Sequence, residues 1–92
     1  MPEKLLIVYG AAWCGDCIRT RRFLERNNIP FEWINIDHNQ EGEAFVLKVN
    51  HGNRSIPTIV FPDGRCLTEP TNHQLALALQ GSENNTATHD NP

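Results

Sequence analysis

The residues best suited to chemistry are two cysteines three positions apart, in the segment Trp13-Cys14-Gly15-Asp16-Cys17. Two intervening residues let the sulfur atoms meet across one helical turn, so a disulfide can form and reopen with little backbone movement. A cysteine at the start of a helix also faces unpaired backbone amides and the positive end of the helix dipole, which stabilise a thiolate. The outer Cys14 is therefore predicted to be a redox nucleophile, and Cys17 the thiol that resolves the mixed disulfide on Cys14.

Charged side chains near the motif act on such a thiolate in opposite directions. The carboxylate of Asp16 disfavours it, whereas the guanidinium groups of Arg19, Arg21 and Arg22 favour it. Arg19, Arg22 and Arg26 also share one face at helical spacing, which is typical of a surface exposed to solvent.

The cysteine pair permits two other interpretations, a zinc site and a structural disulfide. Zinc takes four ligands, and the remaining candidates have no paired ligand spacing: Cys66, His38, His51, His73 and His89. No metal site is therefore predicted. A structural disulfide in so short a loop would be unusual in a reducing compartment. Cys66 is interpreted as a small buried apolar side chain or an incidental thiol in an edge strand.

The motif lies between two elements that must position it. Residues 5–9 form a continuous apolar run, which predicts a central strand buried on both faces. Residues 14–27 predict a helix, which ends before Pro30 because proline disfavours helical geometry in the preceding residue. Residues 31–37 alternate as a second strand does, and a second helix is predicted from the polar residues 37–40 to about Asn50.

The second half of the chain predicts a hairpin and a last helix. Residues 56–61 indicate a strand, and the turn at 61–65 leads to an antiparallel edge strand at 66–68. Thr71 and Gln74 have the spacing of a capping box at the start of a helix that Gly81 ends. The order is β-α-β-α-β-β-α, and a strand-helix-strand succession implies a parallel crossover.

Length and charge limit the function classes. The 92 residues allow one small domain, predicted as residues 1–81, followed by a polar tail at 82–92 that is expected to be disordered. A formal charge of −3 provides no basic field for nucleic acid or a membrane surface. The apolar run at 5–13 is too short for a membrane span and a poor match to a signal peptide. We therefore expect a cytoplasmic protein, and we expect a monomer.

Several segments together resemble the glutaredoxin-like proteins of the thioredoxin fold, in particular the mycoredoxin branch of small bacterial glutaredoxins. The resemblance covers about residues 4–80 and rests on four segments: Trp13–Cys17, Asp37–Asn39, Asn50–Thr58, and Asp63-Gly64 with Leu67-Thr68. It implies an α/β fold with a four-stranded mixed sheet flanked by helices. It also implies a thiol-disulfide oxidoreductase that reduces protein disulfides or mixed disulfides with a small thiol.

The resemblance further implies roles for individual residues. Pro57 would be a cis proline beside the two cysteines, and the backbone of Ile56 would hydrogen-bond the substrate chain. The N-terminus of the last helix at Thr71 and Asn72 would hold a carboxylate of the thiol, although helix capping explains these two residues equally well. The remaining contacts with substrate or thiol would come from the motif itself: Trp13, Gly15 and Asp16.

Two departures from the family pattern bear on the electron source. Glutathione-using relatives often carry a lysine shortly before the first cysteine and a Gly-Gly pair before the last helix, whereas this chain has Tyr9–Ala12 and Leu67–Pro70 there. The candidate electron sources are a small thiol, glutathione or mycothiol, and a thioredoxin reductase. Two alternative functions are an electron donor dedicated to one enzyme, such as ribonucleotide reductase, and a dithiol carrier of an iron-sulfur cluster or zinc.

Overall fold

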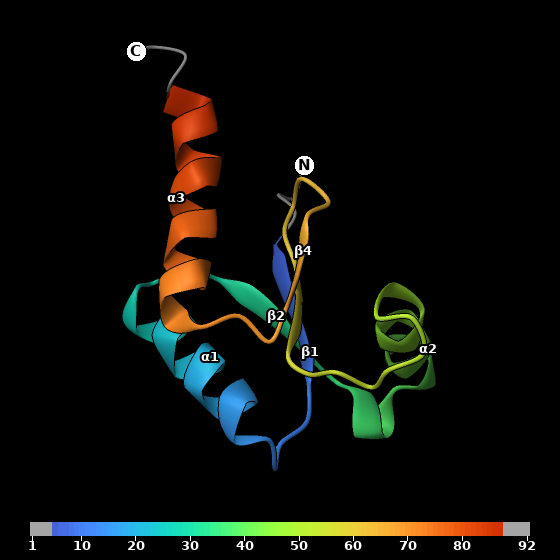
Figure 1. Cartoon of the computed structure of the whole chain (residues 1–92). Helices are drawn as coiled ribbons and strands as arrows, with labels where there is room; N and C mark the ends of the chain where they lie inside the picture. The colour runs from blue at the N-terminus through green and yellow to red at the C-terminus, as the bar shows by residue number, and fades with distance from the viewer. Residues whose placement is uncertain (1–4, 88–92) are drawn as a thin grey trace.

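Four short strands form one mixed sheet at the centre of the molecule (Figure 1). The computed structural model describes residues 5–87. β1 (Leu6–Gly10) pairs in parallel with β2 (Phe31–Asn35) and antiparallel with β3 (Thr58–Val60), which pairs antiparallel with β4 (Cys66–Thr68). The strand order β2-β1-β3-β4 confirms the predicted α/β fold with a four-stranded mixed sheet.

The helices cover the two faces of the sheet unequally. α1 (Gly15–Arg26) and α3 (Asn72–Ala87) lie on one face, whereas α2 (Gln40–Val49), preceded by the short 3-10 helix η1 (Ile36–His38), lies on the other (Figure 1). Among residues 5–87, no helix has the length and apolar character needed to cross a membrane.

The main core lies between the sheet and the α1–α3 layer. It is built from six buried side chains that come from two strands, two helices and the residue that follows β3: Leu6, Val8, Leu24, Ile59, Phe61 and Leu75. Along β1, burial alternates, because Val8 is fully buried whereas Ile7 and Tyr9 are only half-buried. The prediction that this strand is buried on both faces was therefore wrong, since α2 covers the second face only in part. Tyr9 stacks on Phe45 of α2 with ring centroids 4.8 Å apart.

Several element ends differ from the sequence prediction for local reasons. β2 ends at Asn35, two residues early, because the Asn35 side chain accepts a hydrogen bond from the Asp37 amide and starts η1. The second helix begins at Gln40, since Asn39 caps it by accepting from the amide of Gly42 at 2.7 Å. Side-chain oxygens of asparagine satisfy free backbone amides in this way at many helix starts.

The C-terminal half contains the predicted hairpin and capping box. The amide of Gly64, at φ +96°, donates to Phe61 in the turn before β4. Thr71 and Gln74 accept hydrogen bonds from each other's amides at 2.9 and 3.0 Å, which confirms the capping box.

The last helix extends further than predicted. α3 continues through Gly81 to Ala87, because an interior glycine costs a helix only about 1 kcal/mol relative to alanine. Of the predicted tail, residues 88–92 lie outside the described residues, and the domain boundary after residue 81 stays a prediction.

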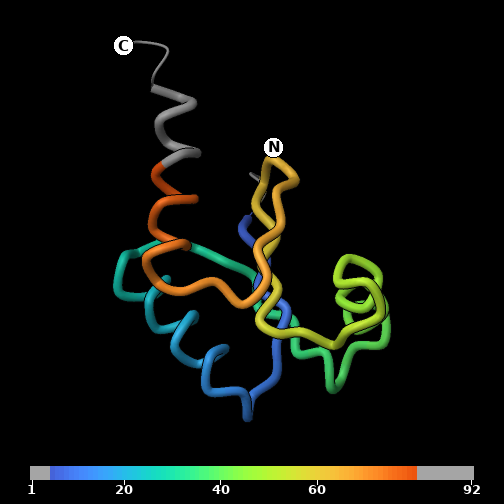
Figure 2. The backbone as a smooth tube through the Cα atoms, viewed as in Figure 1, coloured from blue at the N-terminus to red at the C-terminus, as the bar shows by residue number. Residues whose placement is uncertain are grey.

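Strand directions bring distant segments to one end of the sheet. Because β1 and β3 are antiparallel, the end of β1 lies beside the start of β3, with Tyr9 opposite Thr58. The link from β1 to α1 and the segment that returns from α2 to β3 therefore meet at this end (Figure 2). The cysteine motif and the segment with Pro57 are the residues placed there.

Candidate active site

Cys14 is the N-cap of α1. Its backbone is extended, with φ −81° and ψ 118°, and its Sγ atom accepts a hydrogen bond from the amide of Cys17 at 3.2 Å. The carbonyl of Cys14 also accepts from the amides of Cys17 and Ile18 at 3.1 and 3.0 Å. The sulfur thus occupies the place where a capping oxygen usually lies, facing the unpaired amides of the first helical turn.

The two thiols differ in their access to solvent. Cys14 is largely buried, with 9% of the residue exposed, whereas Cys17 is fully buried. Burial raises the pKa of the Cys17 thiol to about 12, and the hydrogen bond with Cys14 adds to the increase. Cys14 is thus the more exposed of the two cysteines, and Cys17 is a thiol rather than a thiolate at neutral pH.

Cys17 is closely packed against the end of β1. A methyl group placed on Gly10 would lie 2.5 Å from Cys17 Sγ and 2.9 Å from the indole ring of Trp33. Only glycine leaves room at position 10 for both groups. Ala11 completes the buried cluster with the two cysteines, and Trp33 and Ile56 pack against it.

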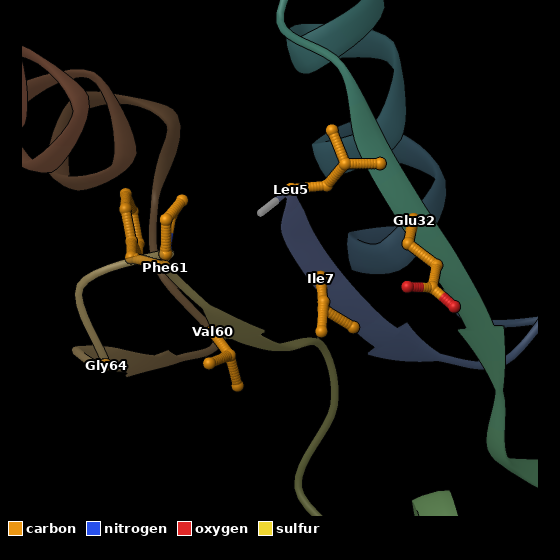
Figure 3. Close-up of a pocket in the computed structure, with 7 residues that line it drawn as sticks. Leu5, Ile7, Glu32, Val60, Phe61 and Gly64 are labelled. Carbon is orange, nitrogen blue, oxygen red and sulfur yellow. The ribbon is translucent and has the colours of Figure 1, made fainter. Parts of the chain in front are cut away.

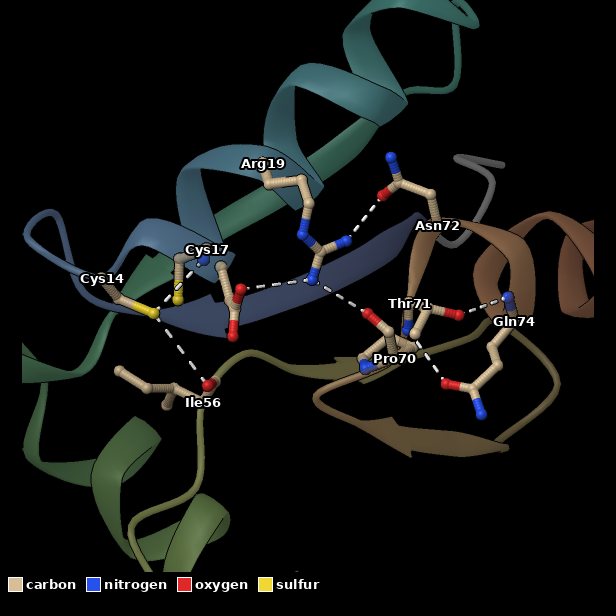
Figure 4. Close-up of polar contacts among 9 residues, drawn as sticks. Cys14, Cys17, Arg19, Ile56, Pro70, Thr71, Asn72 and Gln74 are labelled. Carbon is tan, nitrogen blue, oxygen red and sulfur yellow. Dashed lines mark hydrogen bonds and ion pairs between the residues drawn. The ribbon is translucent and has the colours of Figure 1, made fainter.

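The segment before β3 lies opposite Cys14. The peptide bond between Ile56 and Pro57 is cis, as the family resemblance implies, and Pro57 is buried. The thiol of Cys14 makes a long contact of 4.0 Å with the carbonyl oxygen of Ile56 (Figure 4). The structure thus brings together four of the predicted site residues: Cys14, Cys17, Ile56 and Pro57.

Trp13 joins the motif to a polar network that the sequence did not indicate. Its side chain is 67% exposed, and its indole Nε1 donates to Asp37 at 2.8 Å. Arg54 binds the other Asp37 oxygen at 2.6 Å and Glu43 at 2.6 Å. The hydrogen bonds from Arg54 and Trp13 hold the pKa of Asp37 below its ordinary value. This network connects the motif, η1, α2 and the segment before Pro57.

Arg19 connects α1 to the start of α3. Its guanidinium donates to the side chain of Asn72 at 2.6 Å and to the carbonyl of Pro70 at 3.1 Å, and it lies 3.6 Å from Asp16 (Figure 4). The expectation that Arg19 only faces solvent was therefore wrong. Thr71 lies beside this contact but belongs to the capping box. The roles of Thr71, Asn72 and Asp16 in binding a thiol stay predictions, as does that of the exposed Gly15.

Other features of the described residues lie away from this end of the sheet. A shallow pocket lined by Leu5, Ile7, Glu32, Val60 and Phe61 opens at the other end of β1 and contains neither motif cysteine (Figure 3). Cys66 is exposed on β4, so its interpretation as a buried side chain was wrong. No group of three His, Cys, Asp or Glu side chains is arranged to hold a metal ion within the part of the chain that the structure describes.

Comparison with known proteins assigns this arrangement to a family. Residues 6–67 match the Glutaredoxin family model. The chain belongs to the glutaredoxin family. A Mycobacterium tuberculosis protein that is provisionally named a glutaredoxin is 39% identical over 79 residues, which cover 86% of this chain and 94% of that protein. Mycoredoxin 1 of Corynebacterium glutamicum is 32% identical over 73 residues, covering 79% of this chain and 90% of its own length.

Solved structures agree with the assignment. A glutaredoxin from Archaeoglobus fulgidus is 30% identical, covers 78% of this chain and 82% of its own, and has a TM-score of 0.64. A mutant of a thioredoxin-like protein is 25% identical, covers 84% and 96% of the two chains and has a TM-score of 0.74. As a glutaredoxin, the chain is a thiol-disulfide oxidoreductase with a thioredoxin fold.

The sequence did not predict the side-chain contacts in this glutaredoxin between residues that are far apart along the chain. The Asp37–Arg54 ion pair spans 17 positions, and the Arg19–Asn72 hydrogen bond spans 53. Neither spacing carries a local signal. The packing of Arg21 on Trp33 also links separate elements, with the guanidinium carbon 3.9 Å from the centre of a ring. Only the polar cluster Asp37-His38-Asn39 after β2 pointed to this region.

Proposed function

We propose that this glutaredoxin reduces disulfides by a two-cysteine mechanism in which Cys14 is the nucleophile and Cys17 resolves the intermediate. The observation that carries the proposal is the contrast between the two sulfurs. Cys14 caps α1, is partly exposed (9%) and accepts a hydrogen bond from the amide of Cys17, whereas Cys17 is fully buried one turn further along the helix. This order of access supports attack on substrate by Cys14 alone.

The proposed reaction transfers two electrons to the substrate disulfide. The Cys14 thiolate attacks one substrate sulfur, forms a mixed disulfide and expels the other sulfur as a thiolate. Cys17 then loses its proton to solvent and attacks Cys14 Sγ, which forms the Cys14–Cys17 disulfide. The second substrate sulfur leaves as a thiolate and takes a proton from water. The protein ends oxidised by two electrons, and the substrate ends reduced by two.

The surface around Cys14 supports binding of an extended segment of substrate. Trp13 offers a large exposed apolar side chain next to the nucleophile, and the Ile56 backbone lies opposite Cys14. An extended chain could pair with the backbone before β3 as an added strand does. We propose that these residues, with Pro57, contact protein disulfides or mixed disulfides of small thiols.

We propose a small thiol as the electron source, with mycothiol ahead of glutathione. The similarity to a protein named mycoredoxin 1 supports this order. Glu69, close to the proposed carboxylate site at Thr71 and Asn72, disfavours an anionic thiol there, which keeps a thioredoxin reductase as the alternative donor. A dithiol that acts as a reductant must be kept in its reduced form, as thiols are in the cytosol, so we propose the cytoplasm as the compartment.

The test compares two single substitutions. Cys14→Ser should abolish reduction of every disulfide substrate, whereas Cys17→Ser should still reduce mixed disulfides of the small thiol, because only the first sulfur is needed to take up the thiol. Intact-mass spectra of Cys17→Ser protein in a Cys66→Ser background, after incubation with the disulfide form of mycothiol or glutathione, should show one adduct, on Cys14, with one molecule of the free thiol released. Equal activity of the two variants would contradict the assigned roles, and absence of any adduct together with reduction by thioredoxin reductase would favour the alternative donor.

A further inference from the structure

Arg21 has an unusual environment for a cation on a helix. Its guanidinium lies over the Trp33 ring, 3.9 Å from the ring centre, and its Nε atom is buried without a hydrogen-bond partner among the described residues. The next residue, Arg22, is exposed on the same helix. Burying an N–H without a partner costs free energy, so the attraction to the aromatic face must offset that cost at this position.

Arg21 lies on the side of α1 that also carries the buried thiol. Arg21 follows Cys17 by four positions, so the two side chains lie on one face of α1. The Trp33 ring and Cys17 Sγ both lie next to Gly10, and the guanidinium of Arg21 lies over the same ring. Burial dominates and raises the pKa of Cys17, whereas a hydrogen bond with the backbone of Ala11 and, to a smaller extent, the positive charge of Arg21 lower it.

The other groups around Cys17 do not provide a positive charge. Gly10 on β1, Trp33 on β2 and Ile56 before β3 surround the buried cysteine cluster, and none of these side chains titrates. Cys14 is the other ionisable group that acts on Cys17, and its negative charge raises the pKa of Cys17. Arg21 is therefore the source of positive charge in the described environment of the resolving thiol.

We propose that Arg21, held on the Trp33 ring, supplies the charge that stabilises the Cys17 thiolate during resolution of the mixed disulfide. The inference rests on the proposed function, and it assigns Arg21 to the second chemical step alone. In that step the Cys17 proton passes to solvent, the Cys17–Cys14 bond forms, and the bond between Cys14 and the substrate sulfur breaks. A nearby cation favours the thiolate that starts this exchange.

The test follows the two steps separately with the aromatic disulfide 5,5′-dithiobis-(2-nitrobenzoate). Attack by Cys14 releases one coloured thiolate in a phase whose rate depends on reagent concentration, and attack by Cys17 releases the second in a phase that does not. Stopped-flow traces are recorded from pH 6 to 9 in a Cys66→Ser background, because the exposed Cys66 would react as well. Arg21→Gln is compared with Arg22→Gln, which removes the same charge from the neighbouring exposed position.

We expect Arg21→Gln to slow the second phase by up to about threefold, while the first phase stays unchanged, because a higher pKa lowers the thiolate fraction of Cys17 but makes the thiolate that forms more nucleophilic. The rate of the second phase should rise about tenfold per pH unit in both proteins, since Cys17 is protonated throughout this range. Arg21→Lys, which keeps the charge, should restore most of the rate, and Arg22→Gln should match the parent protein. Arg21→Met, whose chain can still pack on Trp33, replaces the Gln variant if that variant does not fold.

Two results would overturn the assignment of Arg21. One is an unchanged second phase in the variants without charge, and the other is an equal slowing in Arg22→Gln. A first phase that persists in Cys14→Ser would instead contradict the proposed function, because Cys14 would then not be the nucleophile. The two failures are therefore distinguishable in one set of traces.

Discussion

At the scale of single residues, the site depends on one position without a side chain. Gly10 ends β1 between Cys17 and Trp33, and an added methyl group would lie 2.5 Å from the sulfur and 2.9 Å from the ring. Contacts this short force the buried thiol or the indole to move. Overpacking of a well-packed interior typically costs about 1–3 kcal/mol.

Gly10→Ala should therefore lower the free energy of unfolding by about 1–3 kcal/mol and slow closure of the Cys14–Cys17 disulfide. Gly15→Ala is the matched control for stability, because no atom lies within 4 Å of the added methyl group. Urea unfolding of the reduced proteins measures the first effect, and the second-phase rate with the aromatic disulfide measures the other. If Gly10→Ala is as stable as the control, Cys17 and Trp33 can move apart to accommodate the methyl group, and the prediction is contradicted.

At the scale of elements, the sequence predicted those parts of the fold whose signals are local. The capping box at Thr71 and Gln74 and the turn with Gly64 each depend on residues a few positions apart, and both formed as expected. The end of β2 did not, because the competing bond from Asn35 to the Asp37 amide ends the strand where the alternation of side chains continues.

The same difference in range applies to the active site. The strand-helix junction placed Cys14 and Cys17 from sequence alone, because both lie within one turn of α1. The partners of Trp13 and Arg19 could not be predicted, since Asp37 and Asn72 come close only after the sheet and helices pack. Asp37 in particular is exposed, so it left no trace in the hydrophobic pattern.

Asp37 offers a test of how elements are held around Cys14. Asp37→Ala removes the carboxylate and breaks the hydrogen bonds from both Trp13 and Arg54. Trp13 directly precedes Cys14, and Arg54 belongs to the segment before β3. We expect kcat/KM for a protein disulfide to fall about three- to tenfold, mainly through KM, because these contacts position groups rather than react. Asp63→Ala is the control, since Asp63 pairs with Arg65 in the distant turn. An equal effect of both substitutions in steady-state assays would count against a positioning role.

At the scale of the whole molecule, the main core and the cysteine cluster occupy different parts of the sheet. The main core lies between the sheet and α1–α3, whereas the cysteines lie beyond the end of β1, in a small cluster of their own. Substitutions in the larger core should therefore act on stability before they act on thiol chemistry. This separation is also the reason that the length of α3 can be tested independently of the active site.

The described core side chains on α3 end early in the helix. Leu75 is fully buried, and Ala78 and Leu79 pack against the same core, all before Gly81. Deleting residues 82–92 removes none of these contacts. The truncated protein should therefore fold with a melting temperature within about 4 °C of the parent, which is less than a loss of about 1 kcal/mol produces in a domain of this size. Both phases of the reaction with the aromatic disulfide should keep their rates. Deleting residues 75–92 is the matched control, because it also removes Leu75 and should abolish cooperative unfolding. A large drop in melting temperature on the shorter deletion would contradict the predicted domain boundary after residue 81. It would show that the last turns of α3 contribute to the stable core.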